Sequence, residues 1–247
     1  MNWRTLIVVV VIGVAIASAI RSLQGSPEAE FTAEEKAILE RLEPILDTLV
    51  LQQEDLSTLP GHFEPCEGGD PYDLLFGSQG DSPDVEHIEV SRSSYDAPIA
   101  YSSFCDADSG GYVSSLVALP YDKEHLLFLR AVDQEMARAE EGPLRELVDV
   151  NSDDLDPDEE VVDYRWIAAP ELGDSRYAWE MTVDSRDTDQ PFEMYDFTLR
   201  RGLLIGGVLV DVPSHATTEE EAFSVARAFD DRIAAKLKSL AAEVQAP

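Results

Sequence analysis

Positive charge is scarce in this 247-residue chain. Lysine and arginine number 18 against 50 aspartates and glutamates, so the net charge is −32, and only four of the cations are lysines. A surface with this balance repels nucleic acids and anionic lipids, so we expect no nucleic-acid partner. Low lysine with abundant carboxylate is typical of proteins that stay soluble in strong salt. A high-GC codon bias on an ordinary acidic surface explains it equally well.

Short catalytic motifs are also missing. The sequence contains no GxSxG, HExxH, GxxxxGK[ST] or strand-following GxGxxG pattern. Ser214 and His215 are adjacent, and adjacency does not place an imidazole against the serine hydroxyl as a catalytic triad requires. Paired carboxylates could hydrolyse glycosides, but nothing in so acidic a chain selects one pair. We therefore predict no catalytic residue.

The first 26 residues predict an export or membrane signal. Residues 5–20 are uncharged and lie between Arg4 and Arg21. As a helix they would rise about 24 Å, short of the roughly 30 Å hydrocarbon core, although flanking arginines that reach the headgroups could close the gap. The sequence at 17–19, Ala-Ser-Ala, also fits a signal-peptide cleavage site. A retained single-pass anchor and a cleaved signal are equal alternatives, and both export a body whose net charge is −34.

Export changes what the two cysteines mean. Cys66 and Cys105 are the only cysteines, 39 residues apart, and outside the cytoplasm an even number favours a disulfide. Closing a loop of that length would stabilise the fold by about 3 to 4 kcal/mol in the chain-entropy model. Two buried free thiols are the alternative. With so few cysteines and four isolated histidines, a zinc site is not supported.

The acidic stretch 149–160, DVNSDDLDPDEE, is the strongest metal candidate. Asp, Asn and Asp occupy positions 1, 3 and 5 of an EF-hand loop, and Glu160 falls at position 12. However, Asp154 stands where the loop needs glycine, and the segment that follows looks like a strand instead of a helix. We therefore predict a solvated linker with at most weak cation binding, and no metal site or cofactor.

The rest of the chain predicts an α+β domain. Capping-box spacing at Thr32–Glu35 opens a helix that Pro44 should kink or end, and a loop region rich in Gly, Pro, Ser and Asp follows. A second capping box, Thr217 with Glu220, opens a long C-terminal helix. One further helix is expected at 122–141, and strands at 85–91, 97–105, 111–119, 161–168, 176–183, 192–200 and 203–212.

The strands arrive in runs and do not alternate with helices. This order predicts an α+β fold with a central antiparallel sheet of about six to seven strands, flanked by helices. The last two strands should form a hairpin at Arg201-Gly202. The expected division is a signal peptide or anchor at 1–26, a linker at 27–31 and one extracytoplasmic domain at 32–243.

Aromatic residues alternate along successive predicted strands in the second half of the chain. One face of these strands could line a ligand groove, whereas core and cross-strand pairs of an antiparallel sheet are the favoured interpretation. The residues are Tyr164, Trp166, Tyr177, Trp179, Tyr195 and Phe197.

Several segments resemble those of exported bacterial lipoprotein-like α+β domains, which are similar to the extracellular sensor domains of some membrane kinases. The segments are APELGDSRYAWEM, FTLRRGLLIGGVLVDV, TTEEEAFSVARAFDDRIAAKL and LQQEDLSTLPGHFE. The last one departs from the family's DLP.GF pattern, the chain has one cysteine pair where the kinase sensors have two, and no kinase part is present. The resemblance implies an antiparallel α+β fold and binding without catalysis, and it transfers no functional residue.

These observations predict a non-enzymatic extracytoplasmic binding or sensor-like domain. Its partner would be an unknown ligand or an envelope protein, and the N-terminal segment alone would contact the membrane. The alternatives are an extracytoplasmic hydrolase and a calcium-dependent structural or adhesion module.

Overall fold

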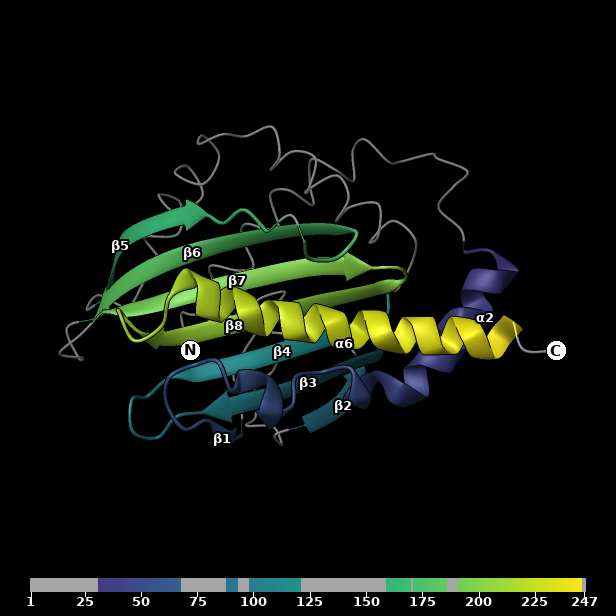
Figure 1. Cartoon of the computed structure of the whole chain (residues 1–247), viewed down its shortest axis with the longest axis horizontal. Helices are drawn as coiled ribbons and strands as arrows, with labels where there is room; N and C mark the ends of the chain where they lie inside the picture. The colour runs from purple at the N-terminus through teal and green to yellow at the C-terminus, as the bar shows by residue number, and fades with distance from the viewer. Residues whose placement is uncertain are drawn as a thin grey trace.

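A computed structural model describes residues 31–67, 88–92, 98–120, 159–169, 171–185 and 191–245. They form one antiparallel sheet with helices packed on one face (Figure 1). The strands are β1 (Glu64–Pro65), β2 (Ile88–Arg92), β3 (Pro98–Cys105), β4 (Tyr112–Ala118), β5 (Glu159–Trp166), β6 (Ser175–Ser185), β7 (Phe192–Arg201) and β8 (Leu204–Pro213). Their order is β1-β3-β4-β8-β7-β6-β5, and β2 also pairs with β3.

The sheet confirms the predicted α+β class with a central antiparallel sheet. All seven expected strands are present, and the eighth strand is the two-residue β1. β1 pairs Glu64 with Cys105, and the predicted disulfide Cys66–Cys105 joins the same two segments, with 5.7 Å between the Cα atoms. The disulfide therefore fastens the loop that follows the first helices to an outer part of the sheet.

β7 and β8 form the predicted hairpin, but its two-residue turn is Gly202-Leu203, one residue later than the predicted Arg201-Gly202. Arg201 pairs with Leu204, and Gly202 has a φ of 60°. A glycine at the first central position suits the tight turn that matches strand twist, because this conformation is strained for residues with a Cβ.

The N-terminal helices cover one part of the sheet. In α2 (Ala33–Leu42), Glu35 N–H donates to Thr32 Oγ1 at 3.2 Å and Thr32 N–H donates to Glu35 Oε2 at 2.8 Å, which confirms the first capping box. Pro44 ends α2 as expected, because the chain continues as two 3₁₀ helices, η1 (Glu43–Thr48) and η2 (Gln53–Leu56). 

The long helix α6 (Glu219–Gln245) begins one residue later than the predicted capping box would place it. Thr218 is the cap: its N–H donates to Glu221 Oε2 at 2.8 Å, and Glu221 N–H donates to Thr218 Oγ1 at 3.3 Å. The sequence TTEEE offers both registers. The structure uses the second one and buries the Thr217 residue, which is 4% exposed.

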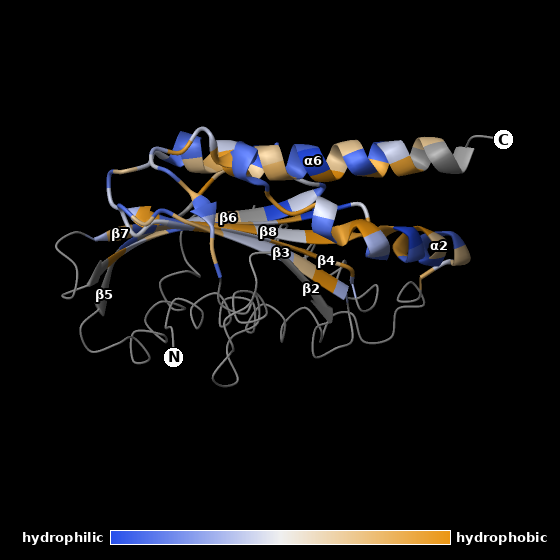
Figure 2. Ribbon diagram, turned by 90° about the horizontal axis from the view of Figure 1, so that it is seen from below, coloured by the Kyte–Doolittle hydropathy of each residue, from blue (hydrophilic) through white to orange (hydrophobic). Residues whose placement is uncertain are grey.

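α6 packs on β7 and β8, which Figure 2 shows edge-on with α6 and α2 on the same side of the sheet. The apolar side chains of α6 face the sheet, and Val225, Phe229 and Ile233 are fully buried. Gly206 on β8 allows this close approach, because a Cβ there would lie 2.7 Å from Phe229 Cε1. The main core therefore lies between the helices and this face of the sheet.

Several predictions fall outside the described residues. They are the N-terminal segment at 1–26, the linker up to residue 30, the helix at 122–141 and most of the acidic stretch. Within the described ranges, no helix is both long enough and apolar enough to span a membrane.

Candidate functional site

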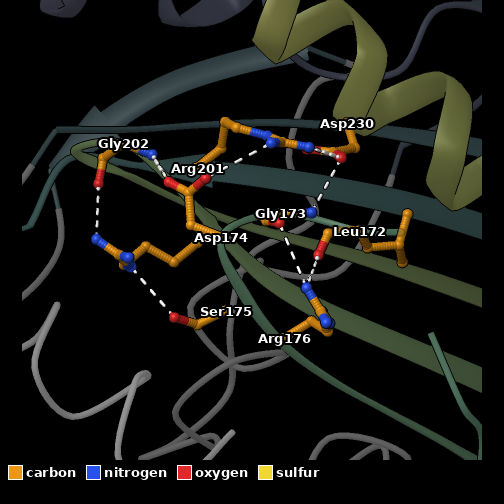
Figure 3. A network of polar contacts seen from close by, with 9 residues as sticks. Leu172, Gly173, Asp174, Ser175, Arg176, Arg201, Gly202 and Asp230 are labelled. Carbon is orange, nitrogen blue, oxygen red and sulfur yellow. Dashed lines mark hydrogen bonds and ion pairs between the residues drawn. The ribbon is translucent and has the colours of Figure 1, made fainter. Parts of the chain in front are cut away.

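Three polar arrangements stand out in the described part, and the first is built from motif residues named above. The Asp230 side chain, 4% exposed, accepts Arg201 Nε at 2.9 Å and also binds Arg201 Nη2 (Figure 3). It accepts Gly173 N–H at 3.0 Å as well, while Asp174 accepts Gly202 N–H at 2.7 Å. We call this set of five residues, Gly173, Asp174, Arg201, Gly202 and Asp230, the Asp230 lock.

The Asp230 lock joins the turn before β6, the β7–β8 hairpin and α6. Gly173 has a φ of 55°, and a Cβ there would lie 2.6 Å from the Arg200 carbonyl oxygen, so the turn depends on glycine. The hydrogen bonds from Arg201 to Asp230 raise the pKa of the guanidinium, which keeps its charge at every pH at which proteins fold. The turn at residues 172–175 and the hairpin at Arg201-Gly202, which lie in two of the segments that carry the family resemblance, thus have a structural role in this chain.

The second arrangement lies on the helix-covered face, where β5, β6 and β7 meet the start of α6. We call it the Glu193 cluster, and its members are Arg165, Glu180, Glu193, Tyr195, Ser214, His215 and Glu219. Two segments far apart in sequence, 165–195 and 214–219, come together here. The cluster is reachable by solvent, since the Arg165 side chain is 50% exposed and His215 93%.

Glu193 binds three donors. Its Oε1 accepts Ser214 Oγ at 2.7 Å and His215 N–H at 3.3 Å, and its Oε2 accepts Tyr195 Oη at 3.0 Å. Ser214 therefore donates to a carboxylate and not to its imidazole neighbour. His215 has a φ of 67°, in the left-handed region that histidine adopts more readily than most residues. Glu193 thus organises the turn that leads into α6.

Glu180 has fewer hydrogen-bond donors around its carboxylate than Glu193 has. Its side chain is 15% exposed, and its Oε2 lies 2.5 Å from Arg165 Nη2, which also contacts Glu219 Oε2 at 2.6 Å. Burial raises the pKa of Glu180 although Arg165 opposes the rise, and the nearby charge of Glu193 adds to it. A carboxylic acid of raised pKa beside a second carboxylate is the arrangement from which general acid catalysis can develop.

Glu180 and Glu193 share one face of adjacent strands. Glu180 is the Cα partner of Tyr195, and Glu193 lies two residues from Tyr195 along β7. Such diagonal neighbours have Cα atoms about 7–8 Å apart. The two carboxylates could therefore flank a glycosidic bond, and this is the pair that the sequence did not select.

The third arrangement is Asp196, which lies on the opposite face of β7. The residue is 6% exposed, and its Oδ1 accepts Thr198 Oγ1 at 3.2 Å. Burial raises the pKa of Asp196 to about 7, and the Thr198 hydrogen bond opposes this only in part. Because a substrate in solution does not reach so buried a group, we treat Asp196 as a determinant of stability.

The sequence-predicted sites have separate outcomes. Residues 149–158 of the acidic stretch lie outside the described residues, but Glu160 lies in β5, which confirms the strand expected where an EF-hand would continue as a helix. Within the described part, no three His, Cys, Asp or Glu side chains are placed to hold one metal ion.

Three of the six aromatic residues have described side chains, and these three do not share one face of the sheet. Trp179, Tyr195 and Phe197 are all buried, at 4%, 2% and 0% exposure. Tyr195 and Phe197 pack in the main core beneath the helices, whereas Trp179 is not part of that cluster. For these three residues, the core interpretation is confirmed.

No protein-family model matches this chain, and neither does any curated protein or solved structure.

Sequence reasoning missed Glu180, Glu193 and Asp196. The available signal was a charge at an inward position of an alternating strand: Glu180 follows Ala178 on one face, and Asp196 lies between two buried residues of β7. A charged residue at such a position needs a partner or a shifted pKa. In a chain with 50 acidic residues, this signal is hard to separate from surface charge.

Proposed function

We propose that this protein is an exported, membrane-tethered binding or sensor-like domain without catalytic activity. The observation that carries the proposal is the disulfide between Cys66 and Cys105. Disulfides form and persist in oxidising compartments and are rare in the cytosol. The uncharged segment at residues 5–20 supplies the export signal or the anchor.

The structural role of the Asp230 lock supports binding in preference to catalysis. The resemblance to exported sensor-like domains rests on a few short motifs. In this chain these motifs hold the turn before β6, the β7–β8 hairpin and α6 together. The fold thus offers a rigid body whose ligand or envelope partner would contact the solvent-exposed surface.

The location of the domain is tested by adding protease to cells whose outer layers have been removed and whose cytoplasmic membrane is intact. A protein with its domain outside the membrane loses the domain to added protease while a cytoplasmic control protein survives. If the domain is digested only after the cells are lysed, the proposal is wrong.

The hydrolase alternative has one specific observation in its favour, the pairing of Glu180 with Glu193. Burial raises the pKa of Glu180, which suits a general acid, and Arg165 and Tyr195 lie beside the pair. If this alternative is right, the purified protein cleaves at least one member of a broad glycoside panel, and Glu180→Gln removes that activity. The matched control is Glu220→Gln, which changes an exposed carboxylate of α6. A protein inert across the panel refutes the alternative.

A further inference from the structure

Within the residues that the structure describes, four cations without a side-chain partner lie on α2 and on the C-terminal part of α6. Arg165, Arg201, Arg227 and Arg232 each form an ion pair with a carboxylate. In the described part of the chain, no ion pair or side-chain hydrogen bond joins another residue to Lys36, Arg41, Lys236 or Lys238. In a protein with nearly three carboxylates for every cation, four unpaired cations on two helices call for an explanation.

The two helices that carry these cations lie together. Figures 1 and 2 both show α2 beside the C-terminal part of α6, at the same end of the long axis. Ile38 and Leu39 of α2 and Leu237 and Leu240 of α6 pack against the same core. We call α2 with residues 231–245 the neutral end, because these segments hold five carboxylates and five cations.

The neutral end contrasts with the rest of the domain. The chain after residue 26 carries a net charge of −34, and none of this excess comes from the neutral end. An anionic membrane surface repels a body of this charge, so a tethered domain should turn its least negative surface toward the lipid.

The chain also enters the domain at the neutral end. Thr32 caps α2, and it lies only 12 positions after Ile20, the last residue of the uncharged N-terminal segment. Twelve extended residues span at most about 40 Å, so the tether keeps α2 near the membrane. The exposed Lys36 and Lys238 and the half-buried Lys236 are then within reach of phospholipid headgroups.

We propose that the neutral end is the membrane-facing surface of the domain, and that Lys36, Lys236 and Lys238 contact anionic phospholipid headgroups. This inference rests on the proposed membrane tether and extends the membrane contact from the N-terminal segment to the domain itself. Each lysine near an anionic surface contributes about fivefold to the preference for this orientation at low ionic strength. 

The test compares two labels on full-length protein in vesicles. A fluorophore on Ser239→Cys reports the neutral end, and one on Ala216→Cys reports the other end of α6; both positions are exposed. They lie about 30 Å apart at 1.5 Å per residue, so a quencher on lipid headgroups reaches them unequally. The ratio of quenching at 239 to that at 216 is measured in neutral phosphatidylcholine vesicles and in vesicles containing phosphatidylglycerol. The salt is the lowest at which circular dichroism shows the protein folded.

The tether alone predicts the same ratio in both kinds of vesicle. We expect a higher ratio in the anionic vesicles, and Lys238→Gln should reduce this enhancement by up to about fivefold. Arg227→Gln is the matched control, because it removes one charge from the same helix at a residue that is 51% exposed and paired with Glu171. About 1 M salt should abolish the enhancement, since the Debye length falls to about 3 Å.

The outcomes separate the two proposals. A protein that does not float with vesicles after an alkaline wash contradicts the membrane tether itself. A protein that floats but gives equal ratios in neutral and anionic vesicles keeps the tether and overturns the lipid contact. An enhancement that Arg227→Gln reduces as much as Lys238→Gln also overturns it, because the effect then follows total charge and not the neutral end.

Discussion

Asp196 is one buried acid that makes the free energy of unfolding depend on pH. Replacing it by Asn should remove most of that contribution. Asn has nearly the shape of a protonated Asp, and Thr198 can still donate to its side-chain oxygen. The two proteins should therefore be about equally stable near pH 4. Above that pH they should diverge, because only the wild type must either keep a proton or bury a charge.

The size of the divergence follows from the shifted pKa. The pKa of Asp196 is about 7 in the folded protein, against 3.8 for an exposed aspartate. Between these values the folded state holds a proton that the unfolded state releases, so the free energy of unfolding falls as pH rises, by about 1.4 kcal/mol per unit. Over about three units the loss is about 4 kcal/mol, and above pH 7 it is complete.

Urea denaturation at constant salt between pH 4 and pH 8.5 measures this difference. The Asn variant should be more stable than the wild type by a few kcal/mol at pH 8 and by little at pH 4. Asp47→Asn changes an exposed carboxyl and should leave the pH dependence as in the wild type. A difference between Asp196→Asn and wild type that stays constant across this pH range would refute the assignment of a raised pKa.

Three further changes test the packing. Gly206→Ala places a methyl group 2.7 Å from an aromatic carbon of α6, so it should destabilise the fold by about 1–3 kcal/mol in urea; an unchanged midpoint would contradict the close approach. Asp230→Ala leaves Arg201 without its buried partner and should cost about 3–5 kcal/mol, and equal stability would show that the Asp230 lock contributes nothing. Replacing Cys66 and Cys105 together by serine should lower the free energy of unfolding by about 3–4 kcal/mol, and a loss below 1 kcal/mol would contradict the loop-closure argument.

Local patterns account for most of the fold that could be predicted. The β7–β8 hairpin follows from two alternating strands around Arg201-Gly202, and the end of α2 follows from Pro44, because each is decided by residues close in sequence. The first residue of α6 could not be fixed in this way, because Thr217 and Thr218 each have a glutamate three residues on.

The Glu193 cluster could not be predicted, for a physical reason. Its members come from three strands, a turn and a helix, and strand register brings them together. Glu180 and Glu193 became a pair only once β6 and β7 were aligned, since a shift of one residue would turn one of them to the other face. The predicted disulfide succeeded without this knowledge, because only two cysteines were available.

The most direct test of the central claim is the intact mass of the native protein, isolated from fractionated cells after alkylation of free thiols. The account predicts a protein in the membrane or exported fraction, without alkylated cysteine and two hydrogens lighter than its reduced form. Loss of about 19 residues would identify signal cleavage, and full length in the membrane would identify an anchor. A full-length protein in the cytosol with Cys66 and Cys105 both alkylated would contradict the account.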